Sequence, residues 1–354
     1  MEQARARGWA NPSSVHAAGR ASRQLLDAAR DQVAAIVGAR STDVVFTCGG
    51  TEACNLGVMG LCSAAAGAHV VTTTIEHPAV ARSVAELRAQ GAEVTELPVI
   101  EGLAPDLSAL KEALRENTKL VAIQWVNHET GTLFPIEAYA QLCAERGVPL
   151  FVDGTQALGK VQIDLRSLPI TGLALASHKV GGPAGAGALI VRRTCELTPR
   201  QLGGGQERGR RAGSPDVVSI AGFGAACGAV QQRLSAQPQI AKLRDAIEQD
   251  LVQLGAQRNG LRGERVATVT NVSLPAMRGA DMVAALDLEG LCCSSGAACS
   301  SGLASPSPVL RAMYPGEPER ALGALRLSFG PESLQLNSQS ITDKLHAVFD
   351  RLQE

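Results

Sequence analysis

The chain has 354 residues, of which 45% are hydrophobic and 19% are charged, and its net charge is −1. This composition excludes a disordered chain, and neither the balanced charge nor the 3% of aromatic residues favours a nucleic-acid-binding protein. Nine scattered cysteines without a C-x-x-C pair favour free thiols over a disulfide framework or a structural zinc site. The N-terminus lacks the apolar run of a signal peptide, so we expect a cytoplasmic protein.

Between about residues 30 and 195, short apolar segments alternate with helical patterns. This alternation predicts an α/β fold in which a mostly parallel sheet lies between helices. The predicted strands are residues 44–47, 70–74, 120–126, 150–152, 173–176 and 188–191.

A loop rich in glycine and arginine spans residues 201–215, and a long helical region follows it through about Leu254. We place the domain boundary inside this helical region, which predicts a large domain at 1–232 and a smaller α+β domain at 233–354. The elements predicted for the smaller domain are strands at 267–274 and 324–328 and helices at 281–288 and 341–352.

Five polar clusters follow successive predicted strands of the large domain. They are residues 49–52, 76–77, 127–131, 153–156 and 177–179. Because the carboxyl ends of parallel strands meet at one edge of a sheet, these clusters predict one shared site.

Within this site, the residue types suit pyridoxal phosphate. Lys179 precedes a glycine-rich stretch that a bulky group could approach, and a buried lysine there would have a lowered pKa and could form a Schiff base. Asp153 is either a cap or the partner of a buried cation, such as a pyridinium nitrogen. The helix that opens at residues 49–51 offers its N–H groups to a phosphate. His77 could lie on the ring, cap a helix or belong to the core.

Taken together, these segments resemble the class V aminotransferase superfamily, and in particular the NifS/IscS-type cysteine desulfurases. The resemblance covers nearly the whole chain, and its motifs keep the family's order with similar spacing. The matching segments are NPSSVHAAGR (11–20), FTCGGTEACNLGV (46–58), TTTIEHPAV (72–80), VNHETGTLFPI (126–136), FVDGTQALGK (151–160), ASHKVGGPAGAGAL (176–189), GGGQERGRRAGS (203–214), TNVSLP (270–275), SSGAACSSG (294–302) and LRLSFG (325–330). The resemblance implies the pyridoxal-phosphate-dependent transferase fold of type I.

The resemblance also implies a role for each matching residue at the cofactor. Lys179 would bond the cofactor, Asp153 would hold the pyridinium proton, and Gln156 would bond the ring hydroxyl. His77 would stack on the ring and move protons. The residues implied around the phosphate are Gly50, Thr51, Ser177, His178 and, across a homodimer interface, Ser214.

For the substrate, the resemblance implies that L-cysteine becomes L-alanine. Asn127, which also borders the cofactor, and Arg326 would grip the substrate carboxylate. Cys299 would be the nucleophile that keeps the sulfur as a persulfide. Cys292 and Cys293 follow an apolar residue, and we expect them in a buried strand; an iron–sulfur cluster on the three cysteines has weak support, because no fourth ligand is evident.

The chain departs from the family pattern at four places, one of which is Ser214, where the family usually has threonine. Family members begin with a segment about 25–30 residues before the N-P-S-S motif, whereas ten residues precede Asn11 here. Ala176 stands where the family often has serine, and His128 stands where the family has the second asparagine of V-N-N-E.

Two other readings stay open. A selenocysteine lyase would use the same fold, cofactor and active-site cysteine. A non-catalytic partner-binding homologue would explain the missing N-terminal segment. For an active enzyme, the resemblance implies a sulfur acceptor: an iron–sulfur scaffold, a tRNA-thiolation protein or a DNA-sulfur-modification protein.

Overall fold

The computed structural model describes residues 1–62, 66–274, 277–296 and 306–353, and these residues form two compact units. The first unit consists of Met1–Glu96, Leu107–Trp125 and Pro135–Gln232. The second unit consists of Leu97–Asp106, Val126–Phe134 and Arg233–Glu354. The second unit therefore includes two short segments that the sequence analysis assigned to the large domain.

The elements up to residue 235 are α1 (Glu2–Arg7), α2 (Ala17–Ile36), β1 (Val44–Thr47), α3 (Gly50–Leu61), β2 (His69–Thr73), α4 (Pro78–Ala89), β3 (Glu93–Leu97), α5 (Leu107–Ala113), β4 (Thr118–Gln124), α6 (Ile136–Glu145), β5 (Leu150–Asp153), β6 (Gly172–Ala176), β7 (Gly187–Val191), α7 (Val217–Gly228) and α8 (Val230–Ser235). The elements that follow are α9 (Gln237–Gln253), β8 (Gln257–Arg258), β9 (Val269–Ser273), α10 (Gly279–Leu288), α11 (Pro308–Met313), α12 (Pro318–Leu322), β10 (Ala324–Ser328) and α13 (Ser338–Gln353).

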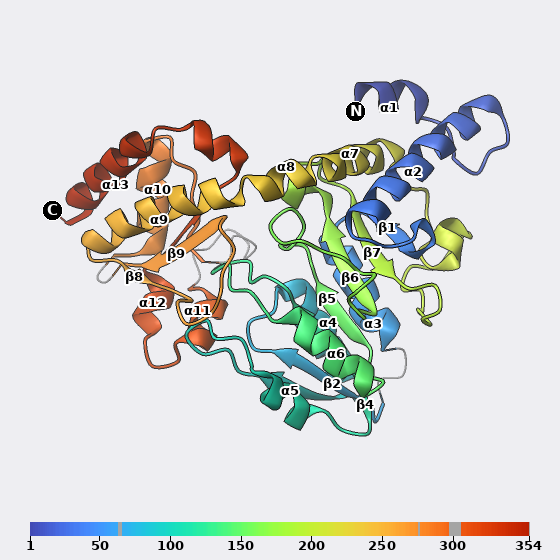
Figure 1. The fold of residues 1–354 in the computed structure, drawn as a ribbon, viewed down its shortest axis with the longest axis horizontal. Coiled ribbons are helices and arrows are strands. Elements are labelled where there is room, and N and C mark those ends of the chain that lie inside the picture. The colour runs from blue at the N-terminus through green and yellow to red at the C-terminus, as the bar shows by residue number, and fades with distance from the viewer. Residues whose placement is uncertain (63–65, 275–276, 297–305, 354) are drawn as a thin grey trace. The chain divides into compact units, whose positions relative to one another are not determined.

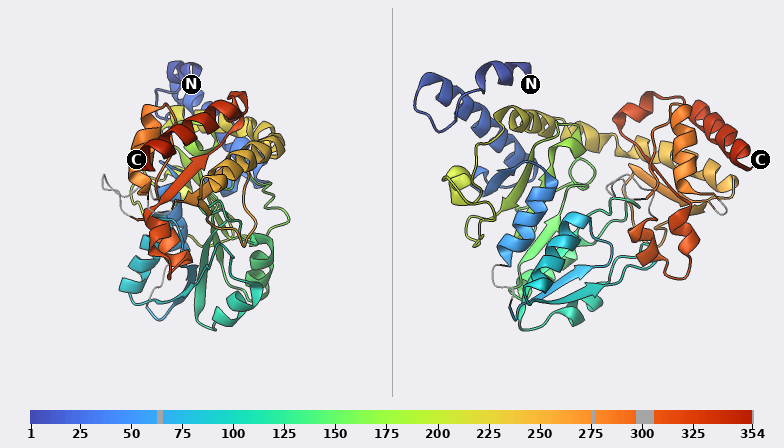
Figure 2. Two further views of the ribbon diagram at one scale, coloured as in Figure 1. Left: turned by 90° about the vertical axis from the view of Figure 1, so that its left-hand side faces the viewer. Right: turned by 180° about the vertical axis from the view of Figure 1, so that it is seen from behind.

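The first unit is built on a seven-stranded sheet with the order β1-β7-β6-β5-β4-β2-β3. Strands β2, β4, β5 and β6 run parallel, and β7 is antiparallel to both of its neighbours. Helices α3 and α4 lie on one face of the sheet and α6 lies on the other (Figures 1 and 2). This arrangement confirms the predicted α/β fold with a mostly parallel sheet.

Within this seven-stranded sheet, the apolar pattern misses strand β3. It lies at the edge of the sheet, and its residues Glu93–Leu97 are mostly polar and partly exposed. An edge strand needs no continuous apolar run, because solvent can reach its outer side.

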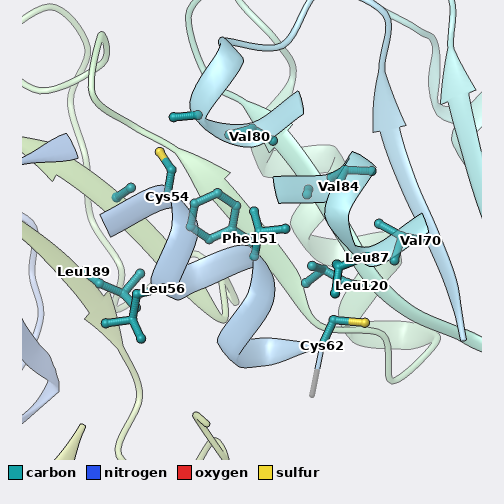
Figure 3. Packing of buried hydrophobic residues seen from close by; sticks show 14 of the residues in the cluster. Cys54, Leu56, Cys62, Val70, Val80, Val84, Leu87, Leu120, Phe151 and Leu189 are labelled. Atoms are coloured by element: carbon teal, nitrogen blue, oxygen red, sulfur yellow. The ribbon is translucent and has the colours of Figure 1, made fainter. Parts of the chain in front are cut away.

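A buried hydrophobic core holds α3 against the sheet. Figure 3 shows the ring of Phe151 among side chains of α3, α4 and the neighbouring strands. Phe151, Val84 and Leu120 are all buried, and truncating a buried phenylalanine to alanine costs about 3–5 kcal/mol. The core thus anchors α3 firmly on the sheet.

The second unit contains an antiparallel three-stranded sheet with the order β10-β9-β8. Its core joins this sheet to α9, α10 and α13, which are marked in Figure 1. Strand β10 has the predicted bounds, and β9 lies within its predicted range. No helix in the described ranges has the length and apolar character needed to cross a membrane.

A buried ionic cluster stabilises the second unit. Glu248 of α9 is 2% exposed and forms ion pairs with Arg258, at 3.0 Å, and with Arg265. Thr270 Oγ1 donates to the same carboxylate at 2.5 Å. Burial opposes the ionisation of Glu248, but the hydrogen bonds from Arg265 and Thr270 outweigh it, and the pKa of Glu248 is lowered.

Candidate active site

The N-terminus of α3 forms a backbone cradle at the end of β1. The helix begins at Gly50 and has Gly49 as its N-cap, as the sequence predicts. A Cβ atom on Gly50 would lie 2.7 Å from Thr155 Cγ2 and 3.0 Å from Ala176 Cβ, so this close approach requires glycine. Thr51 is exposed in the first turn. The N–H groups of a first helical turn lack helical partners and attract anions.

Asp153 ends β5 and is 4% exposed. Its Oδ1 accepts a hydrogen bond from the Thr155 backbone N–H at 3.0 Å. Among the side chains that the structure describes, none forms an ion pair with this carboxylate. Burial raises the pKa of the Cys54 thiol on α3, and the neighbouring Asp153 raises it further. Asp153 is therefore a buried carboxylate that can accept a cation from outside the chain.

Glu76 is a second buried carboxyl group at this edge, and the sequence analysis gave it no role. It is 7% exposed, its Oε1 accepts a hydrogen bond from Thr73 Oγ1 at 2.5 Å, and its Oε2 is buried without a hydrogen-bond partner. Burial raises the pKa of Glu76 to about 8, although hydrogen bonds from Thr73 and the Gln124 backbone oppose the shift. In the sequence, the position of Glu76 shortly after a predicted strand was the signal that could have marked it as a site residue.

His77 is held by the helix that follows it. It is the N-cap of α4, its Nδ1 accepts a hydrogen bond from the Ala79 N–H at 3.1 Å, and Pro78 is the first helical residue. Burial lowers the pKa of His77, while the charges of Asp153 and Lys179 act on it in opposite directions. The structure thus brings these three predicted residues together, and the helix cap fixes the imidazole.

Lys179 lies just beyond β6, in a 3-10 helix at Ser177–Val180. Its side chain and that of His178 are exposed, so the expectation of a buried lysine is wrong. The physical reason is the turn, which takes the chain out of the sheet as soon as the strand ends. Burial, followed by the charge of Lys179, lowers the pKa of His178.

Ser177 and Ala176 face different neighbours. Ser177 Oγ is buried without a hydrogen-bond partner and would lie 2.2 Å from a Cβ atom on Gly182. It is Ala176 whose side chain lies beside Gly50, at the start of α3. The displacement of the serine by one position therefore turns its hydroxyl away from the helix N-terminus.

Gln156 and Ser214 lie in different surroundings within the first unit. Gln156 is half-buried, and its Oε1 accepts a hydrogen bond from Lys160 Nζ. Ser214 is exposed and lines a small cavity of about 110 Å³ with Thr47 and Cys48, at the end of β1.

In the second unit, Asn127 and Arg326 both form hydrogen bonds with residues of the segment 128–130. Asn127 Oδ1 accepts hydrogen bonds from the N–H groups of Glu129 and Thr130, both at 2.9 Å. Arg326 donates to the His128 carbonyl at 2.9 Å and to Ser294 Oγ at 3.2 Å, and its Nε is buried without a partner. A guanidinium held by neutral acceptors keeps its charge available for a carboxylate.

The predicted nucleophile, Cys299, lies outside the described residues. Cys292 is exposed and Cys293 is half-buried, so the expectation of a buried strand is wrong for both. Gly290 adopts a left-handed conformation after α10, and the residues that follow, 291–293, form no strand. Burial raises the pKa of Cys293 to about 11.

These features of the first unit fit pyridoxal phosphate. Asp153 offers a buried negative charge for a pyridinium nitrogen, and the start of α3 at Gly50 offers backbone N–H groups for a phosphate. Lys179 adds an amine at the same strand edge. These are the groups that this cofactor requires of a protein.

Comparisons with known proteins agree on one family. A family model described as aminotransferase class V matches residues 1–337. A protein named cysteine desulfurase from Nostoc sp. is 38% identical over 351 residues, which is 97% of this chain and 87% of the relative.

Solved structures show the same kinship. A NifS-like protein has a TM-score of 0.89 at 27% identity, and the match covers 100% of this chain and 94% of the other. A structure described as SspA in complex with cysteine has a TM-score of 0.81 at 31% identity and covers 94% of each chain. Because the family model spans nearly all of the sequence, and a relative at 38% identity matches over the same length, this chain belongs to the class V aminotransferase family.

Proposed function

We propose that this protein is a pyridoxal-phosphate-dependent cysteine desulfurase, which converts L-cysteine to L-alanine and transfers the sulfur to Cys299. The observation that carries the proposal is the buried Asp153 carboxylate, which has no ion pair within the described chain and lies at the strand edge shared with His77 and Lys179. The desulfurase from Nostoc sp. and the cysteine complex of SspA support this reaction and this substrate.

Each residue of the first unit has a defined task in this proposal. Asp153 accepts the ring N–H, Lys179 attaches the cofactor covalently, and Gln156 bonds the ring hydroxyl. His77 covers the ring and moves protons. The phosphate is bound by Gly50, Thr51, His178 and, in a homodimer, Ser214. Ser177 is left out, because its hydroxyl faces Gly182.

The second unit supplies the substrate and sulfur contacts. Arg326 binds the substrate carboxylate through its guanidinium fork, and Asn127 contributes its amide nitrogen. When bound, pyridoxal phosphate supplies the electron sink for the substrate carbon. The Cys299 thiolate attacks the substrate sulfur, so that an S–S bond forms as the C–S bond breaks. The bonding electron pair stays with the carbon, which takes up a proton and becomes alanine.

The test uses the full chain loaded with pyridoxal phosphate and incubated with L-cysteine and a reductant. We expect alanine and sulfide in equal amounts, with the visible absorbance of the cofactor as a check on loading. Cys299→Ala should keep this absorbance and lose both products, whereas the matched variant Cys292→Ala should keep both. Normal product formation by Cys299→Ala would contradict the assignment. A preference for selenocysteine in the same assay would identify the lyase alternative.

We also infer a homodimer that delivers sulfur to an acceptor protein. The exposure of Ser214 beside a small cavity supports the dimer, because this hydroxyl has its proposed task only across an interface. Sedimentation of the loaded protein should give twice the monomer mass. The acceptor would be an iron–sulfur scaffold, a tRNA-thiolation protein or a DNA-sulfur-modification protein, and transfer of labelled sulfur from loaded Cys299 would identify which.

A further inference from the structure

Glu129 is a buried carboxyl group in the turn that follows Asn127. Its side chain is 0% exposed, and its Oε2 accepts a hydrogen bond from Ser307 Oγ at 2.5 Å. Its Oε1 is buried and accepts no hydrogen bond from the described residues. Burial raises the pKa of Glu129, while the hydrogen bond from Ser307 and the charge of Arg326 oppose this shift. One oxygen of this carboxyl group is therefore stabilised by nearby charge alone.

His128 is the neighbour that can supply such a charge reversibly. Its Nε2 lies 3.7 Å from Glu129 Oε1, which is too long for a hydrogen bond but within the range of an ion pair. The side chain of His128 is 13% exposed, so solvent protons can reach it. Histidine changes its charge near neutral pH, whereas the asparagine of the family pattern at this position does not. The two side chains can thus exist as a neutral imidazole beside a carboxylate or, with one more proton, as an ion pair.

Arg326 is the permanent charge beside this turn. Its guanidinium donates to the His128 carbonyl at 2.9 Å, and its backbone exchanges hydrogen bonds with Ser294 at 2.7 and 3.1 Å. The turn itself is held by β9, because the Glu129 carbonyl accepts a hydrogen bond from Asn271 Nδ2 at 3.1 Å. A carboxylate bound by Arg326 would therefore bring its negative charge next to a rigid turn that contains both His128 and Glu129.

The formal charges show what a bound carboxylate would change. Without it, the positive charge of Arg326 and the negative charge of Glu129 balance when His128 is neutral. A bound carboxylate adds a second negative charge, and an unbalanced charge in a largely buried site is unfavourable. One proton on the imidazole restores the balance. Because His128 and Glu129 are so close, they titrate as a coupled pair.

We propose that His128 and Glu129 form a proton-accepting pair, which takes up one proton when a carboxylate binds to Arg326. The proton comes from solvent and returns to it when the product leaves. Among the described residues, the charged groups that act on Glu129 are His128 in its own turn and Arg326 of β10, while Ser307 of α11 and Asn271 of β9 are uncharged. The inference rests on the proposed function for its substrate carboxylate, and it makes substrate binding depend on pH.

The first test counts protons in the full chain loaded with pyridoxal phosphate. His128→Asn installs the residue of the family pattern, and His346→Asn on α13 is the matched control in the same unit. The probe is propionate, which has the carboxylate and carbon chain of alanine but no amine that could react with the cofactor. Titration calorimetry in buffers with different heats of ionisation gives the number of protons taken up for each propionate bound.

At the pH of largest uptake, the wild type and His346→Asn should each take up about half a proton or more per site beyond His128→Asn. The pH dependence of affinity gives an independent measure. An opposite charge nearby shifts the titration of a group by about 1–3 units. Between about pH 6 and pH 9, the wild-type dissociation constant for propionate should therefore rise about 10-fold relative to that of His128→Asn, because high pH removes the compensating proton. Equal proton uptake by wild type and His128→Asn, or an equal loss of uptake in His346→Asn, would overturn the proposal.

Product formation from L-cysteine separates this inference from the proposed function. If the wild type forms no alanine but takes up a proton with propionate, and His128→Asn does not, the desulfurase proposal fails and the proton-accepting pair stands. If the wild type forms alanine and the two proteins bind propionate with equal proton uptake, the pair fails alone. Absence of propionate binding to the loaded wild type would also overturn the inference, since no carboxylate would then bind at Arg326.

Discussion

Two regions of the molecule bury carboxyl groups in opposite ways. Glu248 in the second unit has two arginine partners, and its pKa is lowered. At the strand edge of the first unit, Asp153 has no ion pair within the described residues, and Glu76 has its pKa raised to about 8 by burial. Structural ion pairs satisfy their charges internally, whereas perturbed, unpaired groups gather at functional sites. The difference teaches which region serves stability and which serves binding.

The largest effect on stability is expected from replacing Glu248. Glu248→Ala leaves two arginines near a buried position without their partner, so we expect the free energy of unfolding to fall by about 3–5 kcal/mol. Urea unfolding at neutral pH measures this loss. The folded fraction should keep its desulfurase activity per bound cofactor. A loss of activity that exceeds the loss of folded protein would contradict a purely structural role for this cluster.

Asp153→Asn tests the opposite half of the comparison. The amide keeps an acceptor oxygen for the Thr155 N–H but removes the negative charge. We expect alanine production to fall by about 100-fold, the scale seen for removal of one electrostatic contact at an active site. The free energy of unfolding should change by less than about 1 kcal/mol. Alanine production and urea unfolding are measured on the same preparation. A loss of stability as large as that of Glu248→Ala would contradict the claim that Asp153 serves binding and not stability.

The pH dependence of stability should also differ in sign between the two regions. Glu76 has its pKa raised from an ordinary 4.5 to about 8, so the stability tied to its proton is complete below pH 4.5 and is lost as the pH rises to 8. Glu76→Gln should therefore lose less stability than the wild type between these limits. Glu248 has its pKa lowered, so its contribution is present above pH 4.5 and is lost as the pH falls further. Urea unfolding at a series of pH values measures the free energy of unfolding of both proteins. If the two plots of this free energy against pH run parallel, the raised pKa of Glu76 is contradicted.

The smallest effect is expected where an ion pair faces solvent. Arg88 and Glu96 approach to 2.5 Å, but their side chains are 51% and 44% exposed. Arg88→Ala should change the free energy of unfolding by less than about 0.5 kcal/mol, because water and salt screen such pairs. A double-mutant cycle with Glu96→Ala measures the coupling free energy between the two side chains. A coupling as large as the stability loss expected for Glu248→Ala would show that burial does not decide the strength of these ion pairs.

The sequence predicts the parts of this molecule that follow local rules. Apolar runs indicate the central strands, and the polar residues after them lead to Asp153, His77 and the start of α3. Local patterns do not reveal that Lys179 is exposed, since a 3-10 turn after β6 decides its position. Nor do they reveal the bond between Glu129 and Ser307, which lie 178 residues apart and meet only through tertiary packing. Glu76 follows the visible rule, but its raised pKa depends on burial that only the fold creates.

The make-up of the second unit has a consequence for how the chain matures during synthesis. Leu97–Asp106 and Val126–Phe134 leave the ribosome well before Arg233–Glu354, yet all three belong to this unit. Leu133, for example, donates its N–H to the Glu264 carbonyl at 2.7 Å. In a nascent chain that ends at Gln232, these two early stretches lack the part of the second unit against which they pack. A fragment that starts at Arg233 lacks the two stretches themselves. The second unit is therefore completed only when both of its early stretches and its C-terminal part belong to one synthesised chain.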